Sequence, residues 1–215
     1  MRKYDYVLFD LDGTLTNSEG GIKRCINFAM TSLNREPLSD DVLNSMIGPP
    51  FVVSMKRLGM DDETIEKAIK FYRYQYDIDG WCDNKLYDGI VDMLAYLKER
   101  GYRLALATSK PMKFTLKIMD YFDLRRYFDF IGAADSDNKR GTKIEVIDYV
   151  FENMKISDRK KVIMLGDRLY DVEGAKLAKI DSGGVLWGFG SREELVQAGA
   201  NYVFETPNEI KKFFT

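Results

Sequence analysis

The sequence contains no histidine among its 215 residues. This absence excludes serine–histidine catalytic triads, zinc sites of the His-Glu-x-x-His type and phosphotransfer through histidine. Any acid–base chemistry near neutral pH must therefore come from aspartate, glutamate, lysine, tyrosine or cysteine.

Cysteine is scarce, and long apolar runs are missing. Cys25 and Cys82 stand outside any metal-type spacing, so we expect two packed thiols in a reducing cytoplasm. No apolar run reaches 18 residues and Met1–Asp5 lacks the apolar stretch of a signal peptide, so neither a membrane span nor a leader is expected. The 32 basic and 34 acidic residues are well mixed, so no nucleic-acid polymer is expected as a partner. We expect a monomer or a homodimer.

From Tyr102 onward, short apolar runs alternate with amphipathic stretches. This alternation predicts an α/β fold with a parallel sheet that helices flank on both faces. Pro111 is expected in the first turn of a helix, and Ser191 with Glu194 forms a capping-box signature. The expected strands are 103–107, 130–134, 162–165, 184–187 and 202–204, and the expected helices are 111–122, 142–154, 171–179, 191–199 and 207–214.

Residues 18–83 interrupt this alternation, because their apolar residues recur at helical spacing and they show little strand signal. We therefore expect a helical cap domain at 18–83, inserted into a catalytic core made of 1–17 and 84–215. Because the insertion begins within a few residues of Asp12, we expect it to close over the site as a lid. A helical subdomain without a catalytic role is the alternative.

The segment Tyr6–Thr14 runs from an apolar stretch into two carboxylates, a glycine and a threonine. The apolar part predicts a buried strand, and a parallel strand delivers its last side chains to the edge where α/β proteins bind ligands. A turn that begins at Leu11 lets Asp10 and Asp12 face one site, and Thr14 offers them a hydroxyl. A hard divalent cation would neutralise these acids and suit a phosphate-ester substrate. An ordinary Asx turn at the strand end is the alternative.

Three further segments place polar groups at expected element ends. One strand ends at Thr108 and Ser109, where a hydroxyl and backbone N–H groups can hold a phosphoryl oxygen. Lys143 begins a helix, and another strand ends at Asp167, with Asp171 four residues later. Each feature alone has an ordinary structural explanation, but together they indicate one site at one edge of the sheet.

These groups define a reaction that needs no histidine. Mg²⁺ would take carboxylate oxygens of Asp10 and Asp167 and the main-chain carbonyl of Asp12, with Asp171 supporting the metal site. Asp10 would attack phosphorus and form an aspartyl-phosphate, while Asp12 protonates the leaving oxygen and later accepts a proton from water. The Thr108 hydroxyl, the Lys143 ammonium group and three backbone amides would hold the phosphate oxygens. The amides are those of Leu11, Asp12 and Ser109.

In order and spacing, these residues resemble the four motifs of the haloacid dehalogenase-like hydrolase superfamily. The motifs are Asp10-Leu11-Asp12-Gly13-Thr14, Thr108, Lys143 and Gly166-Asp167-x-x-x-Asp171. The resemblance covers essentially the whole chain. It implies an aspartate nucleophile, an aspartate acid/base, Mg²⁺ and a Rossmann-like sheet. The helical insertion is similar to the α-helical cap of that superfamily.

Four shorter segments are similar to phosphoglycolate phosphatase-like and 5′-nucleotidase-like members: 17–22, 47–50, 87–89 and 184–190. Asp12 separates the chain from ion-pumping ATPases, which carry threonine there, and from dehalogenases, which lack the paired aspartates. Asn17 departs from the aspartate of many phosphoglycolate-type relatives. The third motif lacks the Lys-Pro pair of many relatives, so Lys143 rather than Lys139 is assigned from the pattern Lys-x-x-Val-Ile.

The leading expectation is a phosphoglycolate phosphatase-like hydrolase of a small phosphorylated molecule. A 5′-nucleotidase acting on nucleoside monophosphates and a phosphosugar mutase with the same core and cap are alternatives. A phospho-accepting signalling domain is an alternative from another class, although receiver domains are much shorter and lack a helical insertion. Gly188 and Gly190 give only a weak dinucleotide-binding signal, because the third glycine is missing.

Side chains of the cap are expected to read the part of the substrate beyond the phosphate. A basic side chain near the site would favour the carboxylate of phosphoglycolate, and an aromatic one would favour a nucleobase. The candidates are Glu19, Lys23, Gly48, Phe51, Lys56 and Arg57.

Overall fold

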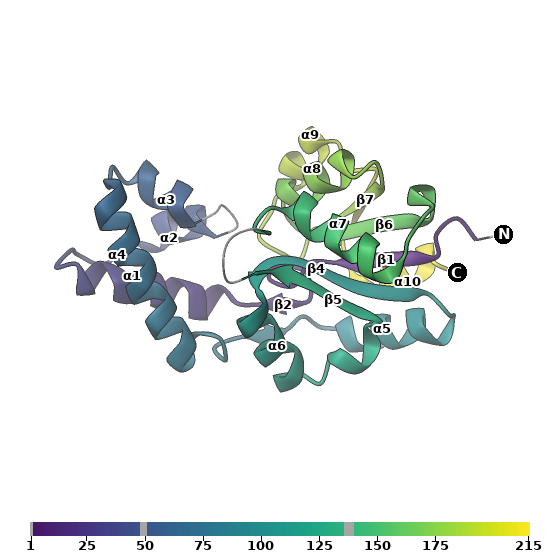
Figure 1. Ribbon diagram of the computed structural model, residues 1–215, viewed down its shortest axis with the longest axis horizontal. Coiled ribbons are helices and arrows are strands. Elements are labelled where there is room, and N and C mark those ends of the chain that lie inside the picture. The colour runs from purple at the N-terminus through teal and green to yellow at the C-terminus, as the bar shows by residue number, and fades with distance from the viewer. Residues whose placement is uncertain (1, 48–50, 136–139) are drawn as a thin grey trace. The chain divides into compact units, whose positions relative to one another are not determined.

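The computed structural model describes residues 2–47, 51–135 and 140–215 (Figure 1). The chain divides into two compact units. The core consists of Met1–Asn17 and Leu86–Thr215, and the helical insert consists of Ser18–Lys85. In the described ranges, none of the helices reaches the length and hydropathy that a bilayer-spanning helix requires.

The core is built on a six-stranded parallel sheet with the strand order β5-β4-β1-β6-β7-β8. The strands are β1 (Tyr6–Phe9), β4 (Arg103–Pro111), β5 (Phe130–Ala134), β6 (Val162–Gly166), β7 (Asp181–Val185) and β8 (Tyr202–Phe204). Leu8 of β1 pairs with Ala105 of β4 on one side and with Met164 of β6 on the other, and all three side chains are buried. The central position of β1 places its carboxyl end between those of β4 and β6. The predicted fold class is confirmed.

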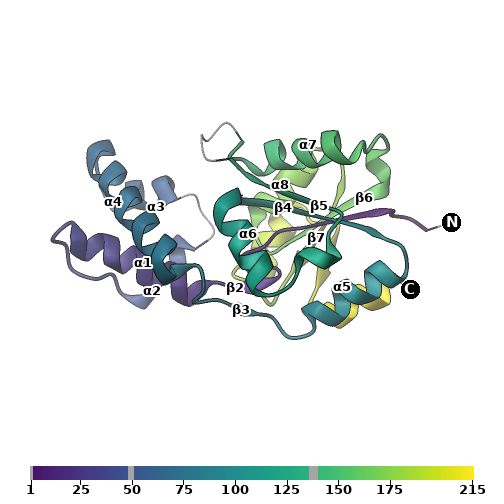
Figure 2. The ribbon, with the colours of Figure 1, turned by 60° about the horizontal axis from the view of Figure 1, so that its bottom comes forward.

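Helices cover both faces of this sheet. They are α5 (Ile90–Glu99), α6 (Met112–Tyr121), α7 (Lys143–Met154), α8 (Leu169–Leu177), α9 (Arg192–Ala198) and α10 (Pro207–Phe213), with short 3-10 turns at Arg125–Tyr127 and Arg159–Lys161. On one face, Val146 and Val150 of α7 and Ala175 of α8 join Leu8 and Met164 in a single apolar cluster. On the other face, α5 and α10 pack against each other (Figure 2).

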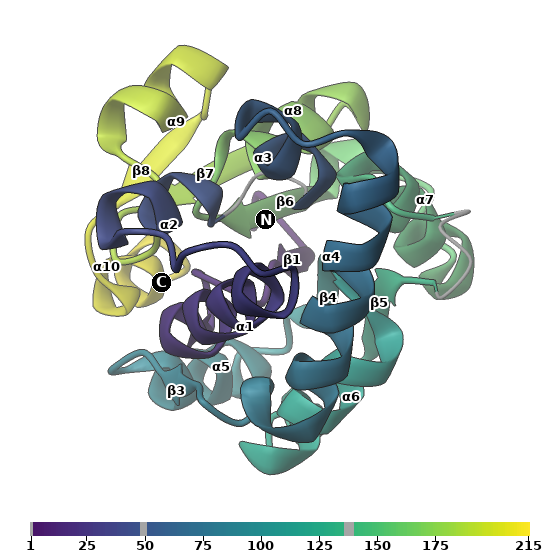
Figure 3. The ribbon, with the colours of Figure 1, turned by 90° about the vertical axis from the view of Figure 1, so that its left-hand side faces the viewer.

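The helical insert contains α1 (Glu19–Ser32), α2 (Asp40–Met46), α3 (Phe51–Arg57) and α4 (Asp62–Gln75), followed by a π-helical turn at Tyr76–Gly80. Asp61 caps the N-terminus of α4, because its side chain accepts the Thr64 N–H at 2.7 Å. Helices α1 and α4 cross (Figure 3) and share an apolar core in which Ile26 and Ala29 meet Ile65. The predicted helical insertion after the first strand is confirmed. Two short strands, β2 (Thr16–Asn17) and β3 (Lys85–Leu86), pair where the chain leaves and re-enters the core.

The structure corrects the expected strand 184–187, because β7 runs over Asp181–Val185. Its two glycines, which weaken the apolar pattern of the sequence, are required by packing. A Cβ atom at Gly183 would stand 2.6 Å from Leu165 Cδ2, and one at Gly184 would stand 2.7 Å from Leu195 Cδ1. Tight packing on both faces therefore replaces the apolar side chains by which a strand is usually recognised.

Four helix starts also differ from expectation, and two of them, α7 at Lys143 and α9 at Arg192, lie one residue after the expected position. β4 continues through Pro111, so α6 begins one residue later, at Met112. Helix α8 begins at Leu169 rather than at 171. The Asp171 side chain reaches back to accept the Arg168 N–H at 3.1 Å, which satisfies a donor in the first turn and adds two residues to the helix.

Candidate active site

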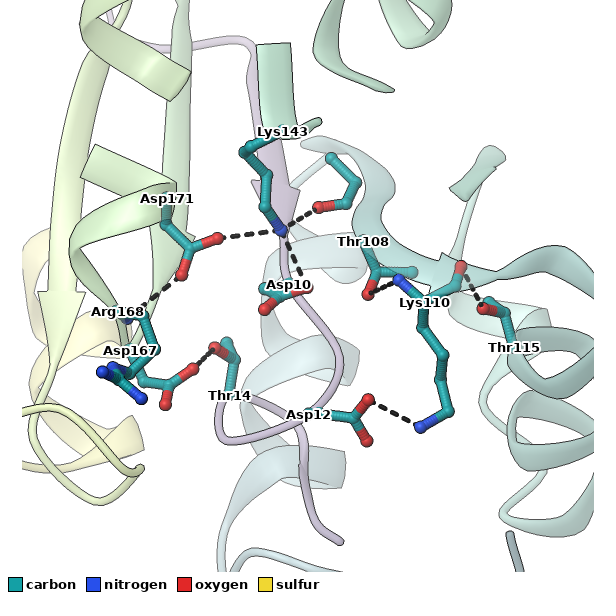
Figure 4. Close-up of polar contacts among 11 residues, drawn as sticks. Asp10, Asp12, Thr14, Thr108, Lys110, Thr115, Lys143, Asp167, Arg168 and Asp171 are labelled. Carbon is teal, nitrogen blue, oxygen red and sulfur yellow. Dashed lines mark hydrogen bonds and ion pairs between the residues drawn. The ribbon is translucent and has the colours of Figure 1, made fainter. Parts of the chain in front are cut away.

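The carboxyl edge of the sheet gathers the polar residues that follow its central strands. Asp10 follows β1, Asp167 follows β6, and Thr108 lies near the end of β4 (Figure 4). The Asp10 N–H donates to the Leu165 carbonyl at 2.9 Å, which continues the β1–β6 pairing to the nucleophile candidate itself. The sheet thus fixes the backbone positions from which these side chains project.

Three aspartates form an acidic cluster at this edge. Asp10, Asp167 and Asp171 each offer one carboxylate oxygen, and these oxygens lie within 4.8 Å of one another. Asp167 is 0% exposed and Asp171 is 2% exposed. Asp167 accepts two hydrogen bonds, from the Thr14 hydroxyl at 3.1 Å and from the Phe189 N–H at 2.9 Å. These bonds orient its carboxylate within the cluster.

Burial and nearby negative charge disfavour the ionised forms of Asp167 and Asp171. Burial raises the pKa of Asp167 well above its usual value of 3.8, and the negative charges of Asp171 and Asp10 raise it further. Burial also raises the pKa of Asp171, to about 6, although the Lys143 ammonium partly offsets this. The cluster is therefore a place where a bound cation would be favourable.

Lys143 supplies one positive charge to the cluster. Its Nζ lies 2.9 Å from Asp10 Oδ1 and 2.8 Å from Asp171 Oδ1, and it donates to the Ala107 carbonyl at 2.7 Å. Burial alone would lower the pKa of Lys143, but Asp10 and Asp171 together raise it above its usual 10.5. The residue is the first of α7, where Thr142 and Glu145 form a capping box that fixes the start of the helix.

Two glycine-containing loops close around Asp167. Gly13 has a positive φ of 82°, and a Cβ atom there would stand 2.1 Å from Asp167 Oδ2. A Cβ atom at Gly188 would stand 2.2 Å from the Gly13 carbonyl oxygen. Trp187 ties the same loops together, because its Nε1–H donates to the Thr14 carbonyl at 2.9 Å. This close approach of backbone to carboxylate requires glycine at both positions.

Asp12 lies outside the acidic cluster and has a different partner. Its Oδ2 accepts from Lys110 Nζ at 2.7 Å, and the Lys110 side chain is 7% exposed. Among the described residues, Asp12 Oδ1 is buried without a hydrogen-bond partner. Lys110 is not among the site residues expected from the sequence. The available signal was its position two residues after Thr108, at a strand end already assigned to the site.

The expected phosphate-binding residues lie at the same edge. Thr108 is buried, and its hydroxyl oxygen accepts the Lys110 N–H at 3.2 Å. Ser109 is exposed. Leu11, which lies between Asp10 and Asp12 in the sequence, is buried. Lys143 contacts Asp10 directly, whereas Lys139 lies outside the described residues.

The candidate specificity residues belong to the helical insert. Lys23 pairs with Glu19 one turn before it on α1, at 2.5 Å. Phe51 packs on Tyr72 with ring centroids 4.9 Å apart, and Arg57 is exposed at the end of α3. Lys56 pairs with Asp62 at 3.1 Å, and Gly48 lies outside the described residues. Their role in recognition, and the role of the insert as a lid, stay predictions.

The acidic cluster fits a hard divalent cation. Carboxylate oxygens are the ligands that Mg²⁺ and Ca²⁺ prefer. Three carboxylates and one ammonium group leave a formal charge of −2 when all are ionised, which a divalent cation would balance. Lys143 pairs with both Asp10 and Asp171, whereas the partners observed for Asp167 are the neutral Thr14 hydroxyl and Phe189 N–H.

We predict that Asp167→Asn raises the melting temperature of the protein in EDTA at pH 7. The folded-state pKa of Asp167 lies above its unfolded value, so ionising this carboxyl group costs more free energy in the folded protein than in the unfolded chain. The neutral amide removes this cost, and each kcal/mol is worth about 2–4 °C in a chain of this size. Thermal melts followed by circular dichroism test the prediction.

The pH dependence of stability provides a second readout of the same variant. At Asp167 and Asp171, the folded protein binds more protons than the unfolded chain between the usual aspartate pKa of 3.8 and the Asp171 value of about 6. These two groups therefore lower the free energy of unfolding as pH rises through this range, and Asp167→Asn should remove the Asp167 part of that decrease. Asp92→Asn on the exposed side of α5 is the matched control. An Asp167→Asn protein that melts at or below the wild-type temperature would contradict the prediction.

Comparisons with known proteins identify the family of the chain. A family model described as haloacid dehalogenase-like hydrolase matches residues 7–185. A 5′-nucleotidase from Pseudomonas aeruginosa is 35% identical over 194 residues, which cover 90% of this chain and 87% of that protein. A phosphoglycolate phosphatase from Colwellia psychrerythraea is 27% identical over 219 residues, which cover 98% of this chain and 96% of that protein.

Two further matches differ in how much of the other protein they cover. Tyrosine-protein kinase PtkA from Mycobacterium tuberculosis is 36% identical over 184 residues, which cover 86% of this chain but 62% of that longer protein. A solved structure described as a predicted phosphatase from Clostridium acetobutylicum is 42% identical, with a TM-score of 0.92 and coverage of 99% of this chain and 98% of that one. The resemblance inferred from the motifs is confirmed. The chain belongs to the haloacid dehalogenase-like hydrolase family.

Proposed function

We propose that the chain is a Mg²⁺-dependent phosphomonoesterase that hydrolyses a small phosphate ester through an aspartyl-phosphate on Asp10. The observation that carries this proposal is the environment of Asp10. Its carboxylate stands at the end of the central strand, within 4.8 Å of two buried carboxylates and 2.9 Å from a buried ammonium group. A nucleophilic carboxylate, a cation site and a fixed positive charge are what phosphoryl transfer needs.

The residues that would hold Mg²⁺ are Asp10, Asp167 and the main-chain carbonyl of Asp12, with Asp171 in support. When bound, the cation would neutralise the acids and draw charge from the phosphoryl oxygens. Lys143 and the two bonds to Asp167 keep these ligands oriented in advance.

Asp10 acts as the nucleophile. One of its carboxylate oxygens attacks phosphorus while the bond from phosphorus to the leaving oxygen breaks. Thr108, the Lys143 ammonium group and the amides of the Leu11–Asp12 turn and of Ser109 face the charge that develops on the phosphoryl oxygens. Lys143 also prevents Asp10 from rotating away, because it contacts Asp10 Oδ1 and two further acceptors at once.

Asp12 carries the proton in both halves of the reaction. It protonates the leaving oxygen as the alcohol departs, and it then accepts a proton from the water that attacks the aspartyl-phosphate. That second step returns Asp10 to its carboxylate form and releases inorganic phosphate. The separation of Asp12 from the acidic cluster supports this division, because its partner is Lys110 rather than another acid.

Two substrate classes are proposed, in order of preference. Phosphoglycolate is proposed from the motif resemblance, and phosphatases of that name match along nearly the whole chain. A nucleoside monophosphate is the second candidate, because the 5′-nucleotidase match has the higher identity of the two. A mutase or a phospho-accepting domain would keep the phosphoryl group instead of releasing it.

Replacing Asp10 by Asn should abolish release of phosphate, because the amide is a poor nucleophile. We expect a loss of at least about 10³-fold in kcat/KM with the fold retained. EDTA should abolish the wild-type activity, and Mg²⁺ should restore it. Asp92→Asn serves as the control for the substitution itself. An Asp10→Asn enzyme with full activity would remove Asp10 from the nucleophile role.

Replacing Asp12 by Asn should slow the reaction most for poor leaving groups. An alkyl phosphate needs protonation of its leaving oxygen, so kcat/KM should fall by about 10²–10⁴-fold. p-Nitrophenyl phosphate, whose leaving group departs as a stable anion, should lose much less. Equal losses on the two substrates would contradict the acid role of Asp12.

A substrate panel separates the candidate activities. It contains phosphoglycolate, nucleoside monophosphates, hexose phosphates and pyrophosphate, compared by kcat/KM for release of inorganic phosphate. We expect phosphoglycolate to be preferred, and a preference for nucleoside monophosphates would select the second candidate. Isomerised sugar phosphate would identify a mutase, and a long-lived phosphorylated Asp10 without turnover would identify a signalling domain.

A further inference from the structure

An irregularity in β4 brings Lys110 to the site. The pairing of β4 with β5 is regular up to Thr108, which stands opposite Ala133, and it resumes with Pro111 opposite Ala134. Two extra residues, Ser109 and Lys110, therefore bulge out of β4 between partners that are adjacent on β5. Bulges of this kind re-aim side chains next to active sites.

The backbone of Lys110 is held at both of its polar groups. Its N–H donates to the Thr108 hydroxyl at 3.2 Å, and its carbonyl accepts from the Thr115 hydroxyl at 3.3 Å (Figure 4). The side chain points toward the loop after β1, where Nζ lies 2.7 Å from Asp12 Oδ2. The two backbone bonds therefore fix the point from which the Lys110 side chain leaves β4.

The two oxygens of Asp12 have different surroundings. Oδ2 is bound by Lys110, whereas Oδ1 is buried and has no hydrogen-bond partner within the described part of the chain. A buried acceptor without a partner is costly, and such atoms in native proteins commonly serve a ligand or a reaction. Oδ1 is therefore the oxygen available to a substrate or to a water molecule.

We propose that Lys110 is a positioning residue, which holds Asp12 Oδ2 so that Oδ1 is the oxygen that carries the transferred proton. This proposal rests on the acid/base role of Asp12 proposed above. The proton on Oδ1 passes to the leaving oxygen as its bond to phosphorus breaks. Oδ1 then takes a proton from the water whose oxygen attacks the aspartyl-phosphate. Lys110 itself exchanges no proton in either step.

A positioning role differs measurably from a merely structural ion pair. A structural pair would affect every substrate alike, whereas a misdirected acid affects only substrates whose leaving group needs a proton. The test therefore compares Lys110→Met with the wild type on an alkyl phosphate and on p-nitrophenyl phosphate. We expect kcat/KM to fall about 10–100-fold on the alkyl phosphate and less than about threefold on p-nitrophenyl phosphate. Lys110→Arg should recover part of the loss.

The double variant Asp12→Asn/Lys110→Met gives the decisive comparison. If Lys110 acts only through Asp12, its removal should change the rate of Asp12→Asn by less than about twofold. Lys113→Met, three residues further along, is the matched control and should stay within about twofold of the wild type on both substrates. Lys110→Gln replaces Lys110→Met if the latter fails to fold by circular dichroism.

Two outcomes would overturn the proposal while leaving the proposed function intact. One is an equal loss on both substrates in Lys110→Met, and the other is losses that multiply in the double variant. In both cases Asp12→Asn alone would still show its dependence on the leaving group. If Asp12→Asn lacks that dependence, the acid role of Asp12 fails, and the proposal for Lys110 fails with it.

Discussion

The site depends on one buried ammonium group. Lys143 places its Nζ within ion-pair distance of Asp10 and Asp171 and donates a hydrogen bond to the Ala107 carbonyl. Without a positive charge, three carboxylates at a buried strand edge would repel one another in a medium that screens weakly. The compensation is one-sided, because Asp167 contacts neutral donors only in the hydrogen bonds observed for it. The negative charge that Lys143 does not balance is therefore that of Asp167, which is where a cation would bind.

The position of Lys143 follows from the packing of two helices. The capping box of Thr142 and Glu145 begins α7 at this residue, and α7 packs against α8. Their contact is close at Gly174, where a Cβ atom would stand 2.6 Å from Lys143 Cγ. The missing side chain at Gly174 gives the lysine stem room to reach the sheet edge. A helix cap and a packing glycine, both beside Lys143, thus fix the position of its charge.

Much of this arrangement could be predicted from the sequence, because its signals are local. A buried strand that ends in an acid places that acid at the carboxyl edge, so the meeting of Asp10 with Asp167 follows from the α/β pattern alone. The boundaries of β7 could not be predicted, because its glycines are required by close packing against Leu165 and Leu195. Neither leucine is near β7 in the sequence. Lys110 was missed for a similar reason. Its direction depends on a bulge defined by the register with β5, and register is a property of two strands together.

The bond from the Trp187 indole to the Thr14 carbonyl has an optical consequence. The chain has two tryptophans, and this one is joined directly to the turn that carries both candidate acids. An indole's emission responds to the polarity and hydrogen bonding around its ring. The protein therefore contains an intrinsic fluorophore bonded to its nucleophile loop, so rearrangements of this loop can be followed by tryptophan fluorescence without an added dye.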